Sequence, residues 1–341
     1  MRDLVVAGGG PVGLVTALFA ARAGLDVVVR EPRRGPVDKA CGEGLMPGAV
    51  TGLQDLGVEL QGRPLVGIRY MDATRSVEAP FRGGTGRGVR RTTLHRALAE
   101  AVAAAGVEVE EAAVKDVRDR GDHVLADGTP ARFLVAADGL HSPTRRAVGL
   151  NGVSRMPRRY AQRAHAAIAP WTDFVEVHWA PSSEAYVTPT ADGQVGVAIL
   201  TRQRGRAFHD LLADHPRLLE RLDGAETGHV RGAGPLRQTS TRRVRGHVLL
   251  VGDAAGYVDA LTGEGIALGL AQARAAIAAV VDGRPQQYER DWRRLTRRHD
   301  LMTTGLVTAT RASLVRTSIV PAAERLPAVF GWAVNQLARP A

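Results

Sequence analysis

The sequence predicts an α/β fold: a domain with a parallel sheet, an antiparallel sheet inserted into it, and C-terminal helices. Residues 4–31 read as a strand, a glycine-rich turn, a helix and a second strand, the pattern of a parallel-sheet domain. Apolar and polar residues alternate at 175–179 and 185–189, as in an antiparallel sheet. The apolar segment 301–338 reads as helical.

Composition excludes several classes of protein. The chain has 341 residues, of which 45% are hydrophobic, enough for one large domain or two moderate ones. The formal net charge is +10, and nearly all of the positive charge comes from Arg, since Lys occurs only at Lys39 and Lys115. These Arg residues are scattered in pairs, which argues against a nucleic-acid partner but suits anionic dinucleotides and acidic substrates.

The chain shows no sign of export or membrane insertion. Its single cysteine, Cys41, cannot form an intramolecular disulfide. The N-terminus enters an apolar strand directly, and no stretch contains the roughly 20 apolar residues of a membrane span. We therefore expect a cytoplasmic protein without a membrane span or a metal site, as a monomer or homodimer.

The first motif is a dinucleotide-binding turn. Residues 4–7 form an apolar strand, and Gly8, Gly10 and Gly13 follow it. Gly8 permits the turn, Gly10 lets a pyrophosphate approach the backbone, and Gly13 lets helix and strand pack closely. Pro11 and Val12 open the helix, whose N-terminus attracts phosphate. Glu31 ends the strand at 26–30 and would accept bonds from ribose hydroxyls.

This turn does not by itself show whether the bound dinucleotide is FAD or NAD. Two later stretches of the sequence distinguish them. The apolar strand at 133–137 is closed by Asp138 and Gly139. The strand at 247–251 runs into Gly252 and Asp253, and Gly263 to Ile266 then open a helix that continues to about Ala279.

Together, the three stretches resemble the nucleotide-binding, DG and GD motifs of group A flavin monooxygenases related to para-hydroxybenzoate hydroxylase. That superfamily includes geranylgeranyl reductases and flavin-dependent halogenases. The resemblance spans about residues 4–277. It implies an FAD-binding Rossmann-like (GR2-type) domain at 1–70, 86–152 and 246–296, a substrate domain at 71–85 and 153–245, and a helical segment at 297–341.

The resemblance also implies roles for single residues. Asp253 would hold the ribityl hydroxyls of FAD, although a turn-forming Asp is the simpler alternative. Asp138 would be tied to FAD and pyridine-nucleotide binding. Arg91, or its neighbour Arg90, would reach FAD unless it is only a solvated charge at a helix start. The full cofactor-binding set is Gly8, Gly10, Pro11, Val12, Gly13, Glu31, Arg91, Asp138, Gly252, Asp253, Gly263, Gly265 and Ile266.

Two further regions would shape the substrate site. The loop DKACGEGLMP at 38–47 should lie over the flavin and looks like the reductase branch. Cys41 in this loop is a candidate catalytic residue or an ordinary small buried residue. On the inserted sheet, Trp179, Tyr186 and Pro189 are candidate pocket residues, with ordinary sheet core as the alternative.

The sequence favours a hydroxylase. In that hypothesis NAD(P)H reduces FAD, O₂ adds to give a flavin C4a-hydroperoxide, and a phenolic or polyketide-type secondary metabolite is hydroxylated. The main alternative is a reductase of carbon–carbon double bonds acting on a lipid-like substrate. Against it, the chain lacks the Tyr-x-Trp-x-Phe-Pro segment typical of geranylgeranyl reductases. A halogenase is disfavoured because the chain has no Trp-x-Trp-x-Ile-Pro segment. A non-catalytic binding protein like the Rab GDP-dissociation inhibitors is disfavoured because such proteins lose the flavin motifs, whereas this chain keeps all three.

Overall fold

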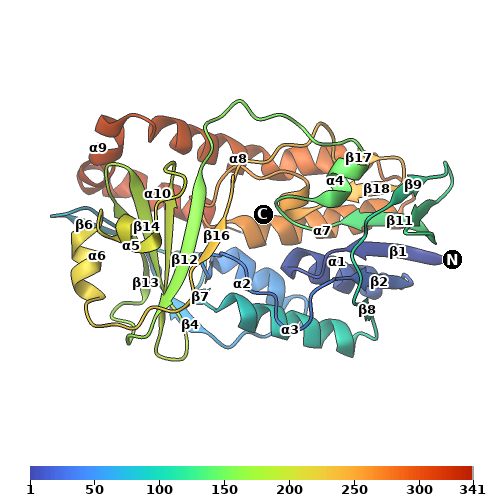
Figure 1. Ribbon diagram of the computed structural model, residues 1–341, viewed down its shortest axis with the longest axis horizontal. Coiled ribbons are helices and arrows are strands. Elements are labelled where there is room, and N and C mark those ends of the chain that lie inside the picture. The colour runs from blue at the N-terminus through green and yellow to red at the C-terminus, as the bar shows by residue number, and fades with distance from the viewer. Residues whose placement is uncertain (340–341) are drawn as a thin grey trace.

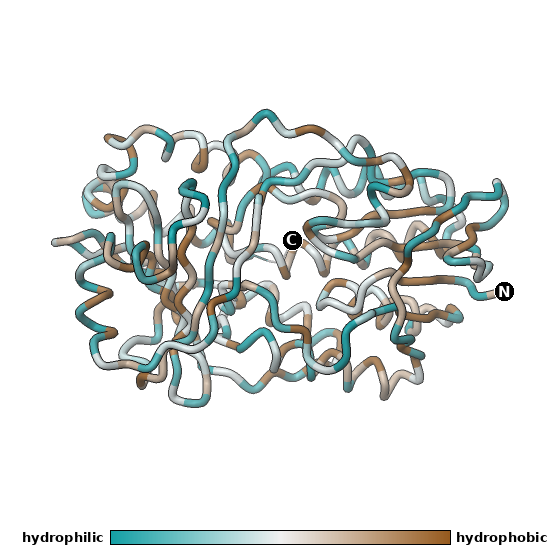
Figure 2. The backbone as a smooth tube through the Cα atoms, viewed as in Figure 1, coloured by the Kyte–Doolittle hydropathy of each residue, from teal (hydrophilic) through white to brown (hydrophobic). Residues whose placement is uncertain are grey.

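The computed structural model describes residues 1–339 and contains a parallel sheet at one end. Its strand order is β17-β18-β11-β1-β2-β8, with β9 and β10 as an antiparallel extension of β11. The strands are β1 Arg2–Ala7, β2 Val27–Arg30, β8 Glu108–Glu110, β9 Val117–Asp119, β10 Val124–Ala126, β11 Thr129–Ala136, β17 Val244–Arg245 and β18 Val248–Leu250. Both faces are covered, so β1 and β11 are apolar runs, which Figure 2 shows as hydrophobic segments.

Three helices pack closely on this sheet. They are α1 Pro11–Arg22, α3 Arg91–Ala104 and α7 Gly265–Val281, and α1 contacts both of the others. The approach of α7 to α1 depends on a small residue, because a Cβ on Gly269 would lie 2.4 Å from the Val12 side chain. The helix predicted from the turn at Gly8–Gly13 and the one predicted after Gly263 are thus α1 and α7.

The second sheet, which we call the substrate sheet after the substrate domain expected from the sequence, has the order β16-β12-β15-β14-β13-β5-β6. It is antiparallel except where β13 pairs with β5. The strands are β5 Gly67–Met71, β6 Ser76–Pro80, β12 Tyr160–Ala166, β13 Phe174–Trp179, β14 Ser183–Pro189, β15 Val195–Thr201 and β16 Arg231–Ala233. The helices α5 Phe208–Leu212 and α6 Pro216–Arg221 follow β15, and Pro216 begins the second of them. The sheet starts at Gly67, four residues before the expected boundary at 71, because β5 pairs with β13 along its whole length.

A small third sheet joins the two large ones. It consists of β3 Gly44–Leu45, β4 Arg63–Leu65 and β7 Gly86–Gly88. Helix α2 Pro47–Gln54 follows β3. The short helix α4 Pro143–Ala147 does not belong to this region and follows β11. A Cβ on Gly88 would lie 1.7 Å from the Pro189 carbonyl oxygen. Only glycine therefore lets this sheet touch β14.

The C-terminal helices connect both ends of the molecule (Figure 1). Helix α8 Gln287–Ala309 packs on α7, and α9 Ser313–Arg325 and α10 Pro327–Leu337 then cover β5, β6 and β13. Among the described residues, none of the helices combines the length and the apolar character that crossing a bilayer needs.

A buried charge network attaches α9 to the substrate sheet. Glu184 on β14 is fully buried and accepts hydrogen bonds from Arg159 and from Arg316 of α9. The Nε atom of Arg159 lies 3.2 Å from Asp259, which belongs to the loop before α7. Burial, and secondarily the Glu184 charge, raises the pKa of Asp259 to about 6, and Arg159 opposes this shift. The network offsets part of its desolvation by pairing two cations with two carboxylates.

The raised pKa predicts a pH-dependent stability contribution. An unfolded Asp has a pKa near 3.9, so Asp259 binds protons more readily in the folded state, and its contribution to stability is lost as pH rises from about 4 to 6. Asp259→Asn mimics the protonated form. We expect the unfolding free energy of Asp259→Asn relative to wild type to increase by about 2–3 kcal/mol between pH 4 and pH 7. Urea unfolding at both pH values measures this, and a pH-independent difference would contradict it.

Candidate functional site

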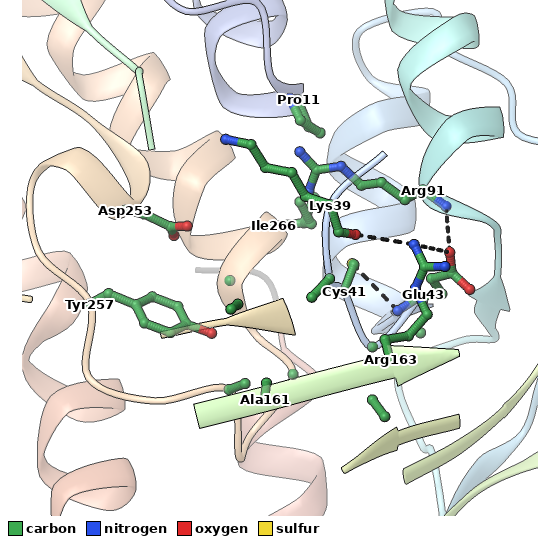
Figure 3. A pocket seen from close by; sticks show the side chains of 18 of the residues that line it. Pro11, Lys39, Cys41, Glu43, Arg91, Ala161, Arg163, Asp253, Tyr257 and Ile266 are labelled. Carbon is green, nitrogen blue, oxygen red and sulfur yellow. Dashed lines mark hydrogen bonds and ion pairs between the residues drawn. The ribbon is translucent and has the colours of Figure 1, made fainter. Parts of the chain in front are cut away.

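A cavity of about 690 Å³ lies between the parallel sheet and the substrate sheet (Figure 3). It opens at the carboxyl ends of β1, β2, β11 and β18, where ligands bind in open α/β sheets. The cavity wall contains twelve of the thirteen residues that the sequence assigned to a cofactor: Gly8, Gly10, Pro11, Val12, Glu31, Arg91, Asp138, Gly252, Asp253, Gly263, Gly265 and Ile266. The cavity therefore brings together motifs that are up to 258 positions apart in the sequence.

The thirteenth residue, Gly13, supports the turn from behind. A Cβ at Gly13 would lie 1.9 Å from the Gly8 carbonyl oxygen, so the first turn of α1 can touch β1 only without a side chain. Gly8 has a φ of +103°, which favours glycine. The backbone N–H of Gly9 donates to Glu31 Oε2 at 2.9 Å. Glu31 is thus fixed at the end of β2, and Arg33 Nε donates to its other oxygen at 2.6 Å.

Positive charge gathers where a pyrophosphate would lie. Arg91 at the start of α3 and Lys39 both reach the cavity beside the N-terminus of α1 (Figure 3). Burial, followed by the charges of Arg33 and Arg91, lowers the pKa of Lys39. Burial raises the pKa of Asp253, and Arg91 and Lys39 are the first groups that oppose this shift. Arg91 and Lys39 thus place two cations beside the N-terminus of α1, where an anionic ligand would be stabilised.

His95, which was not among the residues expected from the sequence, holds the glycine turn by a hydrogen bond. His95 lies one helical turn after Arg91, and its Nε2 is 2.9 Å from the Gly9 carbonyl oxygen. A carbonyl only accepts, so Nε2 carries the proton and donates it. Burial lowers the pKa of His95 and keeps the ring neutral. The spacing of four residues from Arg91 on one helix face was the available signal.

The loop at 38–43 is clamped by the substrate sheet. Glu43 has a φ of +59°, and its carboxylate accepts from the Arg91 backbone N–H at 2.9 Å and lies 2.7 Å from His165 Nε2. The N–H of Glu43 points at Cys41 Sγ, 3.4 Å away. Arg163 Nη1 lies 3.0 Å from His165 Nδ1. Because Arg can only donate, Nδ1 accepts, and His165 donates through Nε2 to Glu43.

Of the three residues that the sequence proposed for the substrate pocket, only Tyr186 lines the cavity. Its hydroxyl donates to the Leu261 carbonyl at 3.0 Å. Trp179 instead packs edge-on against Tyr70, with ring centroids 5.5 Å apart, under the C-terminal helices. Pro189 does not line the cavity, and its carbonyl group packs against Gly88 of β7. The pocket expectation therefore differs from the structure at Trp179 and Pro189. Pro189 lies on the strand face opposite to Tyr186, whereas Trp179 shares a face with Val177 but lies beyond the cavity along β13.

The residues present fit FAD. Asp138 Oδ1 and Arg91 Nε are buried polar atoms without a hydrogen-bond partner, and both residues line the cavity. A Cβ on Gly10 would meet only Arg91 Nη2, at 3.8 Å, so this backbone is open to a ligand. Glu31 would hold the ribose, the α1 N-terminus with Arg91 and Lys39 the pyrophosphate, and Asp253 the ribityl chain.

The family model that describes the FAD binding domain matches residues 1–288. The chain belongs to this family. It is 30% identical over 348 residues to the menaquinone reductase of Mycolicibacterium smegmatis, covering 92% of this chain and 84% of that protein. It is 29% identical to the digeranylgeranylglycerophospholipid reductase 2 of Methanopyrus kandleri, covering 80% of this chain and 75% of that protein.

The fold is shared with a solved hydroxylase. The p-nitrophenol 4-monooxygenase of Pseudomonas putida DLL-E4 superposes with a TM-score of 0.79 and 19% identity, covering 99% of this chain and 95% of that chain. The family resemblance expected from the sequence is thus confirmed. The protein is an FAD-dependent oxidoreductase.

Removal of either acidic group should weaken FAD binding. Glu31→Gln takes one charge from the ribose end, and Asp253→Asn takes one from the ribityl end. Since charged hydrogen bonds contribute about 1.5–3 kcal/mol, each change should raise the Kd for FAD by about ten- to one-hundredfold. Fluorescence titration of deflavinated protein measures this. The exposed Glu100 on α3 provides the control Glu100→Gln, and equal Kd values in all four proteins would refute the assignment.

Proposed function

We propose that the protein is an FAD-dependent reductase that saturates a carbon–carbon double bond in a lipid-like substrate with a prenyl chain. The apolar extension of the cavity carries this proposal. Beyond the cofactor-binding residues, the wall consists of the mainly aliphatic residues Leu65, Ile68, Tyr70, Val175, Val177, Leu261, Val334 and Leu337. A wall of this kind suits a hydrocarbon chain, whose burial is favourable in proportion to its area.

The named relatives support the same substrate class. One acts on menaquinone and the other on digeranylgeranylglycerophospholipid, and both compounds carry prenyl chains. NAD(P)H is the proposed electron source. In the overall reaction NAD(P)H and one proton add two hydrogens across the double bond, and NAD(P)⁺ is released. Bound FAD supplies the hydride chemistry that protein side chains lack.

The protein's part is to orient the chain, exclude water and supply a proton. Cys41 lines the cavity, and the N–H of Glu43 fixes its sulfur. We assign the Cys41 thiol as the proton donor to the substrate carbon. Tyr257 also lines the cavity and carries a hydroxyl group. Burial, followed by the Asp253 charge, raises its pKa well above the usual value, so it keeps its proton and would orient the substrate by hydrogen bonding.

The hydroxylase predicted from the sequence is the second candidate. Its support is the fold shared with p-nitrophenol 4-monooxygenase, and fold alone does not select a reaction. It would need O₂ and an electron-rich aromatic ring beside the flavin. The aliphatic wall at the far end of the cavity favours the reductase.

An anaerobic assay separates the two reactions. We expect the FAD-loaded enzyme to convert a prenyl quinone or a geranylgeranyl lipid into a product two mass units heavier, with NAD(P)H and without O₂. Mass spectrometry detects this product. The control omits FAD or the nicotinamide. If no saturated product forms and a phenol instead gains one atom from ¹⁸O₂, the hydroxylase replaces the reductase.

Substitution of the single cysteine should slow the proton transfer alone. Cys41→Ala should lower the rate of substrate saturation by about one-hundredfold, the usual contribution of a general acid. Reduction of FAD by NAD(P)H, followed by stopped-flow absorbance, should change little. Ser313→Ala, which removes an exposed hydroxyl group outside the cavity wall, is the control and should retain the wild-type saturation rate. A Cys41→Ala variant with wild-type saturation would remove Cys41 from the mechanism.

A further inference from the structure

The C-terminal helix α10 has an unusual surface. Its sequence from Pro327 to Leu337 is PAVFGWAVNQL, which contains no charged residue. A surface helix normally carries polar and charged residues on its outer side. On α10, however, Val329 and Trp332 are 57% and 58% exposed, and Leu326 just before the helix is 58% exposed. We call these three side chains with their flanking residues Arg325 and Arg339 the α10 patch.

The two faces of α10 have different neighbours. At 100° per residue, Phe330, Val334 and Leu337 share an arc of about 60°. These three are buried, and the last two line the substrate end of the cavity. Val329, Trp332 and Gln336 share an arc of about 60° on the other side. The helix therefore lies between the cavity and the surroundings, and it presents apolar side chains to both.

Exposed apolar side chains are concentrated at this end of the chain. Of the thirteen large hydrophobic side chains that are exposed among the described residues, six lie between Leu301 and Trp332. Single exposed hydrophobics are normal, but a group of them marks a surface that another body covers. The question is what covers it.

The charged residues near the α10 patch indicate what covers it. Residues 301–339 contain four arginines and only one acid, Glu324. Arg316 is buried against Glu184, and the other three arginines are exposed. Glu324 is already engaged, since it lies 3.3 Å from Arg75. Arg325 and Arg339 are exposed at the two ends of α10. A tryptophan and aliphatic residues bordered by arginines match the interface of an anionic bilayer, where apolar groups enter the acyl region and cations meet the headgroups.

We propose that the α10 patch docks the protein on the surface of an anionic lipid bilayer. Helix α10 would lie in the plane of the interface, with Leu326, Val329 and Trp332 in the acyl boundary. This inference does not depend on the reaction. It gives a lipid-like substrate a short route, because the opposite face of the same helix already lines the cavity.

Vesicle flotation with the FAD-loaded protein tests the proposal. We expect binding to vesicles of phosphatidylcholine with phosphatidylglycerol, little binding to pure phosphatidylcholine, and weaker binding in high salt. The double variant Val329→Ser with Trp332→Ser should lower the partition coefficient at least about tenfold, since it removes two apolar anchors. The matched control, Val153→Ser with Leu219→Ser, changes two exposed apolar residues elsewhere and should bind as wild type.

Tryptophan fluorescence supplies a second readout that does not need the double variant. Of the four tryptophans, Trp332 is the exposed one. Brominated lipids should quench wild-type emission, and Trp332→Phe should remove the quenching while it keeps vesicle binding. Absence of binding to any vesicle would overturn the proposal. Equal loss of vesicle binding in both double variants would also overturn it. If the protein binds no vesicles and sedimentation shows a dimer that only the Val329→Ser with Trp332→Ser variant disrupts, the patch binds a second copy of the chain instead.

Discussion

The site depends on the buried guanidinium of Arg145. This side chain is fully buried, and none of the ion pairs among the described residues includes it. Its Nη1 donates to the Ala254 carbonyl at 3.0 Å, and its Nη2 donates to the Leu140 carbonyl and to Gln238 Oε1, each at 3.1 Å. Burial lowers its pKa. A buried charge without a carboxylate is costly, and the full set of hydrogen bonds offsets that cost.

The hydrogen bonds of Arg145 connect three segments that border the cavity. Leu140 lies two residues after Asp138 in the segment that follows β11, and Ala254 directly follows Asp253 in the short 3₁₀ helix after β18. Gln238 belongs to the segment that returns from the substrate sheet. One planar cation therefore ties together the two motifs that would face FAD and the segment that returns from the substrate sheet. Its fixed fork of donors sets their relative positions in a way that a flexible lysine would not.

The substrate side is held by the opposite arrangement, in which charges are paired. Glu184 with Arg159 and Arg316 attaches α9 to the sheet, and Glu43 with His165 attaches the loop of Cys41. Both clusters join segments that are more than 100 residues apart. The Glu43 cluster holds the loop that forms part of the cavity wall, and the Glu184 cluster holds α9 on the sheet behind it. Fixed walls help an oxidoreductase to exclude water from its reacting groups.

The sequence by itself determined the dinucleotide turn, the order of the three motifs and most of the residues that line the cofactor end. Each of those features is local: a glycine at a close approach, an acid at the end of a strand, a helix start that follows a turn. The sequence did not determine the domain edges or the exclusion of Trp179 and Pro189 from the cavity, because strand alternation says neither which face meets a cavity nor how far along the strand the cavity reaches. Arg145, His95 and the Glu43–His165 pair were also invisible, since their partners are far away in the chain or are backbone carbonyls. Only tertiary structure decides such contacts, because the cost of a buried polar group fixes its partner after the chain has brought the two together.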